Sequence, residues 1–294
     1  MKDFLLRSLM FVPGHNERLL NSAARSKADV LLLDIEDSVQ PSSNKQLARD
    51  KIEQYLREGY FQKYAVFPRV NDRESGHLLK DIHQLTIEGV HGFVYPKSKT
   101  GQDVYFFDKL LETIEYEKGI KVGTYKIIPL IETASAVLNA QDICKASSRV
   151  IAIAFGCEDF VTDLQGVHDD AGQSIFTARA MIAMAARAHG VVPIDTVHIK
   201  VHDLEDLEKN LIVAKNLGFE GMLVLNPKEL PLVHQYFSPT VEEVNGAEEM
   251  IRLAAKAEEE GKGVTVINGK FVGPPMVLQA KNILKKHTLI QAKP

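Results

Sequence analysis

Two short apolar runs in the middle of the chain each end in acidic residues. The first, IIPLIET, ends at Glu132, and the second, VIAIAFGCEDF, leads into Glu158 and Asp159. Each run holds roughly five to seven apolar residues, which is too short for a core helix and typical of a strand buried on both faces. If the strands are parallel and adjacent, their acids converge at one edge of the sheet. Carboxylates placed in this way favour a hard divalent cation such as Mg²⁺.

Further charged residues follow other apolar runs. Arg69 could bind a substrate carboxylate through two hydrogen bonds, or it could form a structural ion pair with Asp34 or Asp37. Lys97 has the same two interpretations, and an isolated acid could instead cap the next helix. Neighbouring residues of a strand point to opposite sides, so only one of Glu36 and Asp37 is expected to face a ligand if the strand continues.

The cysteines and histidines give weaker indications. Cys157 follows Gly156 directly before the acids, where a nucleophile would need a neighbouring base; a small buried residue is the favoured interpretation. His198 and His202 are four residues apart in an expected strand, about 13 Å at ~3.3 Å per residue, which is too far to share one ion. The run from His168 to Asp170 is expected to be a solvated loop.

Eight apolar runs position these side chains, and helical patterns separate them. Strand and helix alternating eight times predict an α/β fold of the (β/α)₈ TIM barrel class, with an open doubly wound sheet as the alternative. No glycine-rich nucleotide-binding motif follows any run, which weakens that alternative. Besides the two runs above, the expected strands lie within residues 8–14, 30–37, 64–71, 92–98, 196–203 and 221–227.

The remainder of the chain differs from this repeating pattern. We expect residues 1–238 to form the barrel and residues 239–294 to form a C-terminal extension that acts as a lid or as a subunit-contact arm. The extension contains a long helical pattern at residues 240–261, a small hairpin turning at Asn268-Gly269 and a last helix.

Composition excludes several classes of protein. The chain has 294 residues, of which 45% are hydrophobic and 25% charged, and no apolar run approaches the ~18 residues of a membrane span. The net charge of −4, with both signs interspersed, gives no basic surface for nucleic acid. The two cysteines form no CxxC pair, which disfavours disulfides and structural zinc, so we expect a cytoplasmic protein.

Motifs over nearly the whole chain resemble those of the citrate lyase beta-subunit-like proteins of the HpcH/HpaI aldolase family. The resemblance implies a TIM barrel with a C-terminal extension, often trimeric, that uses Mg²⁺. It implies Glu132 and Asp159 as metal ligands and Arg69 as the group that binds a keto-acid carboxylate. With Arg69, we consider Glu36 and Asp37 candidate catalytic residues, and Lys97, Gly156, Cys157 and Glu158 candidate substrate-binding residues. The matching stretches are RSLMFVPG, ADVLLLDIEDSV, KQLAR, FPRVN, GFVYPKS, PLIETASAVLNA, IAFGCEDFVTDL, ARAHGVVPID and FSPTVEEV.

The resemblance also implies an activity. Members of this family cleave or form the carbon–carbon bond between a keto acid and an acyl thioester, usually of coenzyme A. We therefore expect a Mg²⁺-dependent lyase that converts a short 3-hydroxy-dicarboxylic acyl-CoA into acetyl-CoA and oxaloacetate, pyruvate or glyoxylate. One alternative is a coenzyme A-independent aldolase that releases pyruvate or a related keto acid. Another is a catalytically silent paralogue that binds the metal and the keto acid.

Three departures from the family pattern concern the thioester chemistry. The eighth strand has Met222 and Asn226 where many relatives have Lys and His, and Gly273 stands where malyl-CoA-type relatives have an acid/base Asp. Cys157 replaces a small Ala. Without that Asp, the general base is open among Glu36, Asp37 and a metal-bound water.

Overall fold

The computed structural model describes the chain except for residues 1–3, 170–171, 260–264, 268–269 and 294. Two compact units are present, one formed by Leu6–Val233 and the other by Met1–Leu5 together with His234–Pro294. The larger unit contains all eight strands of the barrel. The boundary expected at residue 238 stays a prediction.

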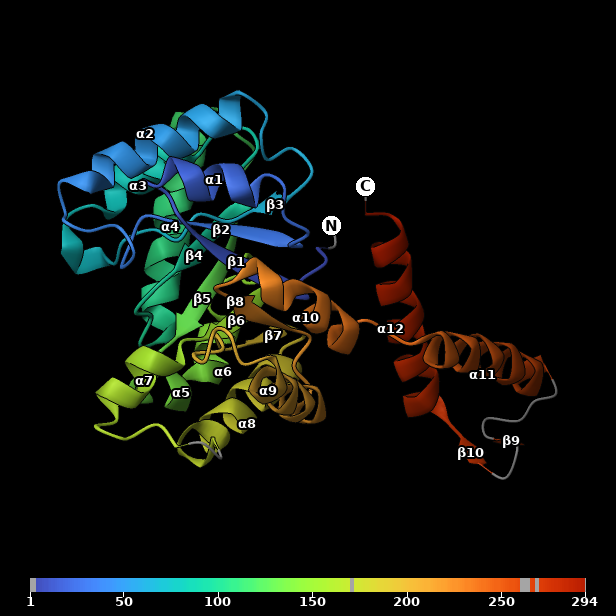
Figure 1. The fold of residues 1–294 in the computed structure, drawn as a ribbon. Helices are drawn as coiled ribbons and strands as arrows, with labels where there is room; N and C mark the ends of the chain where they lie inside the picture. Colours follow the sequence, from blue (N-terminus) through green and yellow to red (C-terminus); the bar gives the residue numbers. More distant parts are fainter. Residues whose placement is uncertain (1–3, 170–171, 260–264, 268–269, 294) are drawn as a thin grey trace. The chain divides into compact units, whose positions relative to one another are not determined.

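Eight parallel strands form the larger unit, in the order β3-β2-β1-β8-β7-β6-β5-β4, with helices around them (Figure 1). This arrangement confirms the predicted (β/α)₈ barrel. Most strand residues are buried, as the apolar runs predict; every residue of the second strand, for example, is buried. The strands are β1 (Ser8–Pro13), β2 (Val30–Asp34), β3 (Ala65–Val66), β4 (Gly92–Tyr95), β5 (Lys126–Ile131), β6 (Ala152–Phe155), β7 (Val192–Asp195) and β8 (Gly221–Val224).

The segment after the short strand β3 joins the two ends of the sheet. The amide of Val94 donates to the carbonyl of Pro68 at 2.9 Å, and the amide of His91 donates to the carbonyl of Val66 at 2.9 Å. Arg69 forms parallel bridges to Asp34 on one side and to Val94 on the other. The backbone of Arg69, a candidate site residue, therefore helps to close the barrel.

The helices of this unit follow the strands in the predicted alternation. Amphipathic spacing explains them: in α2, buried residues recur every three or four positions, as at Lys45, Ala48, Arg49 and Ile52. No described helix has the length and hydrophobicity of a membrane span. The helical elements are α1 (Glu17–Ala23), α2 (Asn44–Arg57), η1 (Arg73–Ser75), α3 (Leu78–Leu85), α4 (Gly101–Glu117), α5 (Ala134–Leu138), α6 (Ala140–Lys145), α7 (Cys157–Asp163), α8 (Gln173–Ala188), α9 (Leu204–Leu217) and η2 (Pro227–Glu229). The next helix, α10 (Leu230–Phe237), begins in this unit and ends in the other.

The seventh strand does not lie where the alternating pattern of residues 196–203 suggested. Strand β7 is Val192–Asp195, and its neighbours are Ala152–Phe155 and Gly221–Val224. A barrel strand is buried on both faces, so the continuous apolar run VVPI suits it better than an alternating one. His198 and His202 consequently lie in the connection to α9, and Asp195 ends the strand.

The smaller unit contains α11 (Val241–Glu259), the strand pair β9 (Thr265–Ile267) and β10 (Lys270–Val272), and α12 (Pro274–Gln291). The two strands are antiparallel, with Phe271 opposite Val266. The predicted helix and hairpin strands are therefore present, whereas the predicted turn at Asn268-Gly269 lies outside the described residues. Gly273 is the N-cap of α12 in an extended conformation, and Pro274 occupies the first helical position.

Candidate functional site

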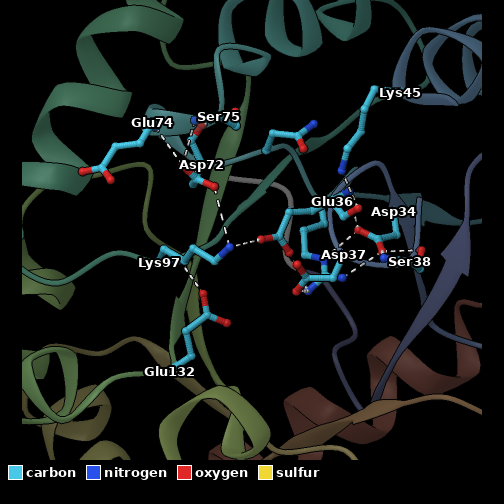
Figure 2. A network of polar contacts seen from close by, with 12 residues as sticks. Asp34, Glu36, Asp37, Ser38, Lys45, Asp72, Glu74, Ser75, Lys97 and Glu132 are labelled. Carbon is cyan, nitrogen blue, oxygen red and sulfur yellow. Dashed lines mark hydrogen bonds and ion pairs between the residues drawn. The ribbon is translucent and has the colours of Figure 1, made fainter. Parts of the chain in front are cut away.

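Lys97 lies at the centre of a polar network beyond the carboxyl ends of the strands (Figure 2). Its backbone amide donates a hydrogen bond to Oε1 of Glu132, the first residue after β5. Its Nζ lies 2.9 Å from Oε1 of Glu36 and 3.6 Å from Oδ2 of Asp72. Lys97 has a positive φ of 52°, which is uncommon for a residue with a side chain and indicates that this turn is held by its surroundings. Lys97, which follows β4, therefore contacts residues that follow three other strands, β2, β3 and β5.

Arg69 forms ion pairs with the acids at and after the end of β2. Its Nε and Nη2 lie 2.6 and 2.8 Å from the two carboxylate oxygens of Asp34, which is the ion pair considered from the sequence. Its Nη1 lies 3.0 Å from Glu36 and 3.6 Å from Asp37. The guanidinium also lies 4.7 Å from the centre of the Phe11 ring. Since Asp34 occupies the Nε edge of the guanidinium, a substrate carboxylate would have to approach the Nη1 side.

The turn after β2 explains why both Glu36 and Asp37 reach Arg69. The strand ends at Asp34, whose carboxylate accepts the amides of Glu36 at 3.0 Å and Ser38 at 3.1 Å. Lys45, on α2, donates from Nζ to the carbonyl of Glu36 at 2.6 Å. The alternation argument, which expected only one of the two acids to face the site, does not apply because the strand has already ended.

Burial and charge shift the titration of the acids near Arg69. Burial raises the pKa of Glu36 to about 7, and the charge of Asp37 adds to this increase while Arg69 and Lys97 oppose it. Burial also acts to raise the pKa of Asp34, but the ion pair with Arg69 outweighs it and holds that pKa below its usual value. Asp34 is therefore ionised as a structural anchor, whereas Glu36 changes its charge near neutral pH.

Glu132 and Asp159 are the acids predicted to hold a metal. Burial raises the pKa of Glu132 to about 8, and the negative charges of Glu36 and Asp159 contribute. Burial likewise raises the pKa of Asp159. Gly156 lies against Glu132: a Cβ there would come within 3.0 Å of Oε2 and 2.8 Å of Cβ. The chain can approach this carboxylate so closely only because residue 156 has no side chain. A buried carboxylate near other acids, whose charges repel, suits a small cation with oxygen ligands.

The charge balance of the site points the same way. We call the following residues the rim network; it contains six acids and three bases, a formal excess of three negative charges. This excess fits a site that binds a divalent cation together with an anionic substrate. The members are Asp34, Glu36, Asp37, Lys45, Arg69, Asp72, Lys97, Glu132 and Asp159.

The segment from Gly156 to Glu158 opens helix α7. Cys157 is buried, its amide donates to Oγ1 of Thr196 at 3.2 Å, and burial raises the pKa of its thiol to about 12. This agrees with a small buried residue and not with an activated nucleophile. The side chain of Glu158 points to His168, with Oε1 3.0 Å from Nε2. His168 is half-buried, so the predicted solvated loop is partly shielded there, and Asp170 lies outside the described residues.

Two members of the rim network were not identified from the sequence as site residues. Asp72 follows Arg69 and Asn71 in a polar stretch after the third apolar run, and this could have indicated its place. Lys45 gives a subtler signal: it is a lysine on the buried face of α2. A buried lysine without a partner would be costly, so its position predicts an acceptor nearby.

A cavity of about 310 Å³ lies beside Arg69 and Asp34. Apolar residues from β1, from α1 and from the segment after β8 form much of its wall, among them Phe11, Leu19 and Leu225. The arrangement therefore combines charged groups with an apolar wall. It can bind a molecule that has an anionic end and an apolar or extended remainder.

Comparisons with known proteins show which proteins the chain resembles in sequence and in fold. Residues 7–227 match the family described as HpcH/HpaI aldolase/citrate lyase. The chain is 34% identical to citrate lyase subunit beta of Haemophilus influenzae over 96% of this chain and 97% of that protein. It is 30% identical to L-malyl-CoA/beta-methylmalyl-CoA lyase of Rhodobacter capsulatus over 96% and 94%. The fold is similar to CitE of Mycobacterium tuberculosis in complex with magnesium, acetoacetate and coenzyme A, with a TM-score of 0.72, 24% identity and coverage of 96% and 100%.

Proposed function

This chain belongs to the HpcH/HpaI aldolase/citrate lyase family, and from that premise we propose that it is a Mg²⁺-dependent carbon–carbon lyase. Its substrate would be a short 3-hydroxy-dicarboxylic acyl-CoA thioester, cleaved to acetyl-CoA and a keto acid such as oxaloacetate, pyruvate or glyoxylate. The observation that carries the proposal is the buried carboxylate of Glu132, against which Gly156 packs closely and whose pKa is raised by the charge of Asp159.

Glu132 and Asp159 are the proposed metal ligands. Both are carboxylates, which Mg²⁺ prefers, and the negative charge of Asp159 raises the pKa of Glu132 in the absence of a cation. When bound, Mg²⁺ acts as a Lewis acid that polarises the substrate oxygens. Relatives named as lyases, and a similar fold solved with magnesium, support the assignment.

Arg69 and Lys97 are proposed to bind the anionic part of the substrate. The Nη1 of Arg69 and the Nζ of Lys97 both reach Glu36, so an incoming carboxylate would compete with this acid for the two cations. Gly156, Cys157 and Glu158 are proposed to border the same substrate. The amides of Gly156 and Cys157 already donate to Ile131 and Thr196, so contact there would use the surface that Gly156 leaves open and the side chain of Glu158.

We assign the general base to Glu36 in preference to Asp37. Glu36 is buried between two cationic groups and has a pKa of about 7, which suits proton transfer at neutral pH, whereas the side chain of Asp37 is 54% exposed. Glu36 would take the proton of the substrate hydroxyl. As the carbon–carbon bond breaks, the C–O bond becomes the keto-acid carbonyl. The bond's electron pair passes to the carbon next to the thioester, which is then protonated.

The departures from the family pattern bear on the thioester half of the substrate. Met222 is buried in β8, and the side chain of Asn226 accepts the amide of Lys228 at 3.0 Å, so both residues have structural roles. The apolar wall of the cavity beside Arg69 favours a thioester arm over a small free hydroxy acid. We also propose a homotrimer, from the family resemblance, and a cytoplasmic location, from the cysteine usage; sedimentation velocity would test the first.

The test is to incubate the purified protein with Mg²⁺ and citramalyl-, malyl- or citryl-CoA, beside the free hydroxy acids, and to assay acetyl-CoA and keto acid. Release from a thioester that is lost with EDTA is the expected result. Keto acid from coenzyme-free compounds alone would make the protein an aldolase. Binding of keto acid without any product would make it a silent paralogue.

A further inference from the structure

A second group of metal-binding side chains lies where α7 and the loop after it meet. Cys157 Sγ lies 3.5 Å from Oε1 of Glu158, and this oxygen lies 3.0 Å from Nε2 of His168. One ligand atom from each of the three residues lies within 4.8 Å of the other two. We propose that Cys157, Glu158 and His168 form a binding site for a thiophilic divalent cation of the Zn²⁺ type, separate from the proposed Mg²⁺ site.

The distances already approach those of a tetrahedral centre. Bonds of about 2.3 Å to sulfur and about 2.0–2.2 Å to nitrogen or oxygen place tetrahedral ligands roughly 3.3–3.6 Å apart. The sulfur–oxygen distance of 3.5 Å lies in this range, and the oxygen–nitrogen distance of 3.0 Å is a few tenths shorter. The third separation, between the sulfur and the imidazole nitrogen, is at most 4.8 Å, so side-chain rotations that bring these two atoms closer would complete the site.

The imidazole of His168 supplies an independent indication. Its Nε2 is shielded from solvent and makes no hydrogen bond among the described residues, although it lies 3.0 Å from Oε1 of Glu158. A shielded polar nitrogen without a hydrogen bond is destabilising. A cation between the nitrogen, the carboxylate and the sulfur would satisfy all three atoms.

The ligand set distinguishes this site from the rim network. Sulfur and imidazole ligands favour Zn²⁺ and its neighbours in the transition series, whereas Mg²⁺ prefers oxygen ligands. Cys157 and His168 also line a cavity of about 110 Å³ together with Thr196 and His198. That cavity has room for a water molecule or a small ligand as the fourth group. Binding would release the thiol proton of Cys157 to solvent.

The experiment is a titration of the full chain with Co²⁺, which reports thiolate coordination by a charge-transfer band. Excess Mg²⁺ is present to occupy carboxylate sites. We expect the band to form and to be displaced by Zn²⁺. In Cys157→Ala it is expected to be lost, and in His168→Gln half-saturation is expected to need at least about tenfold more Co²⁺.

Two controls make the result specific. Cys144, the other buried free cysteine, lies on α6, so Cys144→Ala is expected to retain the band. Glu132→Gln is also expected to retain it, because Glu132 belongs to the proposed Mg²⁺ site; the band thus distinguishes the two metal sites. A band that survives Cys157→Ala, or no band in the wild-type chain, would overturn the inference.

Discussion

The backbone amide of Lys97 donates to the carboxylate of Glu132, while the side chain of Lys97 lies 2.9 Å from Glu36. One residue therefore contacts the proposed metal ligand through its main chain and the proposed base through its ammonium group. The two contacts can be separated experimentally, because a change of side chain at this position leaves the amide in place.

The pH dependence of activity should report Glu36. Below its pKa of about 7 the carboxyl holds its proton and cannot act as a base, so activity is expected to rise as the pH increases through 7. In Glu36→Gln this rise in activity with pH, the acidic limb of the pH profile, should disappear. The value of kcat/KM should fall by about 10²–10⁴-fold. The measurement is a profile of log kcat/KM from pH 5 to 9. A wild-type limb that persists in the variant would exclude Glu36 as the base.

Two charge changes should move the same limb in opposite directions. Lys97→Met removes a cation that lowers the pKa of Glu36, so the limb should move to higher pH. Asp37→Asn removes an anion that raises this pKa, so the limb should move to lower pH. Shifts of the same sign in both variants would contradict the electrostatic account.

Mg²⁺ binding should depend on Glu132. In the wild-type chain, Mg²⁺ at about 100 times its Kd, with oxaloacetate, is expected to stabilise the fold by about 2.7 kcal/mol and to raise Tm. In Glu132→Gln this protection should be absent. Glu112→Gln, which changes a half-buried acid of α4 paired with Lys109, is the matched control and should keep it. Protection that survives Glu132→Gln would show that the metal assignment is wrong.

The absence of a side chain at Gly156 should matter for both stability and metal binding. An added Cβ would lie 2.8 Å from Glu132 Cβ, so Gly156→Ala must displace that residue and is expected to cost about 1–3 kcal/mol. The Mg²⁺ concentration for half-maximal activity should also increase. Gly246→Ala on α11, where a Cβ meets nothing within 4 Å, should be neutral or stabilising by up to about 1 kcal/mol. Equal melting temperatures for the two variants would contradict this explanation.

The buried carboxyl of Glu229 should make the fold less stable at pH 7 and above than it is below pH 4.5. It is fully buried and neither carboxylate oxygen makes a hydrogen bond of regular geometry among the described residues; burial raises its pKa to about 7, while the backbone amides of Asn226 and Leu225 oppose this increase. Both folded and unfolded chains hold this proton below pH 4.5. As the pH rises toward 7 the unfolded chain loses it first, so this contribution falls by up to about 3 kcal/mol and stays low above pH 7.

Glu229→Gln should remove that dependence. Relative to the wild-type chain, the variant is expected to gain stability between pH 5 and 8, measured as the difference in urea midpoint or Tm at each pH. A difference that does not change with pH would show that Glu229 does not titrate in this way.

Several features follow from local sequence alone and are confirmed. The short apolar runs determined the barrel class, because strands buried on both faces need continuous apolar residues. The motifs around Glu132 and Asp159 determined the family, which the comparisons confirm. The acids after β2, β5 and β6 could be assigned to one rim because parallel strands end on the same side of a barrel.

Other features were decided only by tertiary structure. Partners such as Lys97 and Glu132, or Arg69 and Asp34, are 35 residues apart in sequence, so no local pattern indicates which acid meets which base. The seventh strand was misplaced because burial on both faces, and not alternation, selects the strand. The meeting of Cys157 with His168 likewise depends on how the loop after α7 folds back. Periodicity along the chain specifies which face a residue occupies, whereas the pairing of charges depends on contacts that only the closed barrel creates.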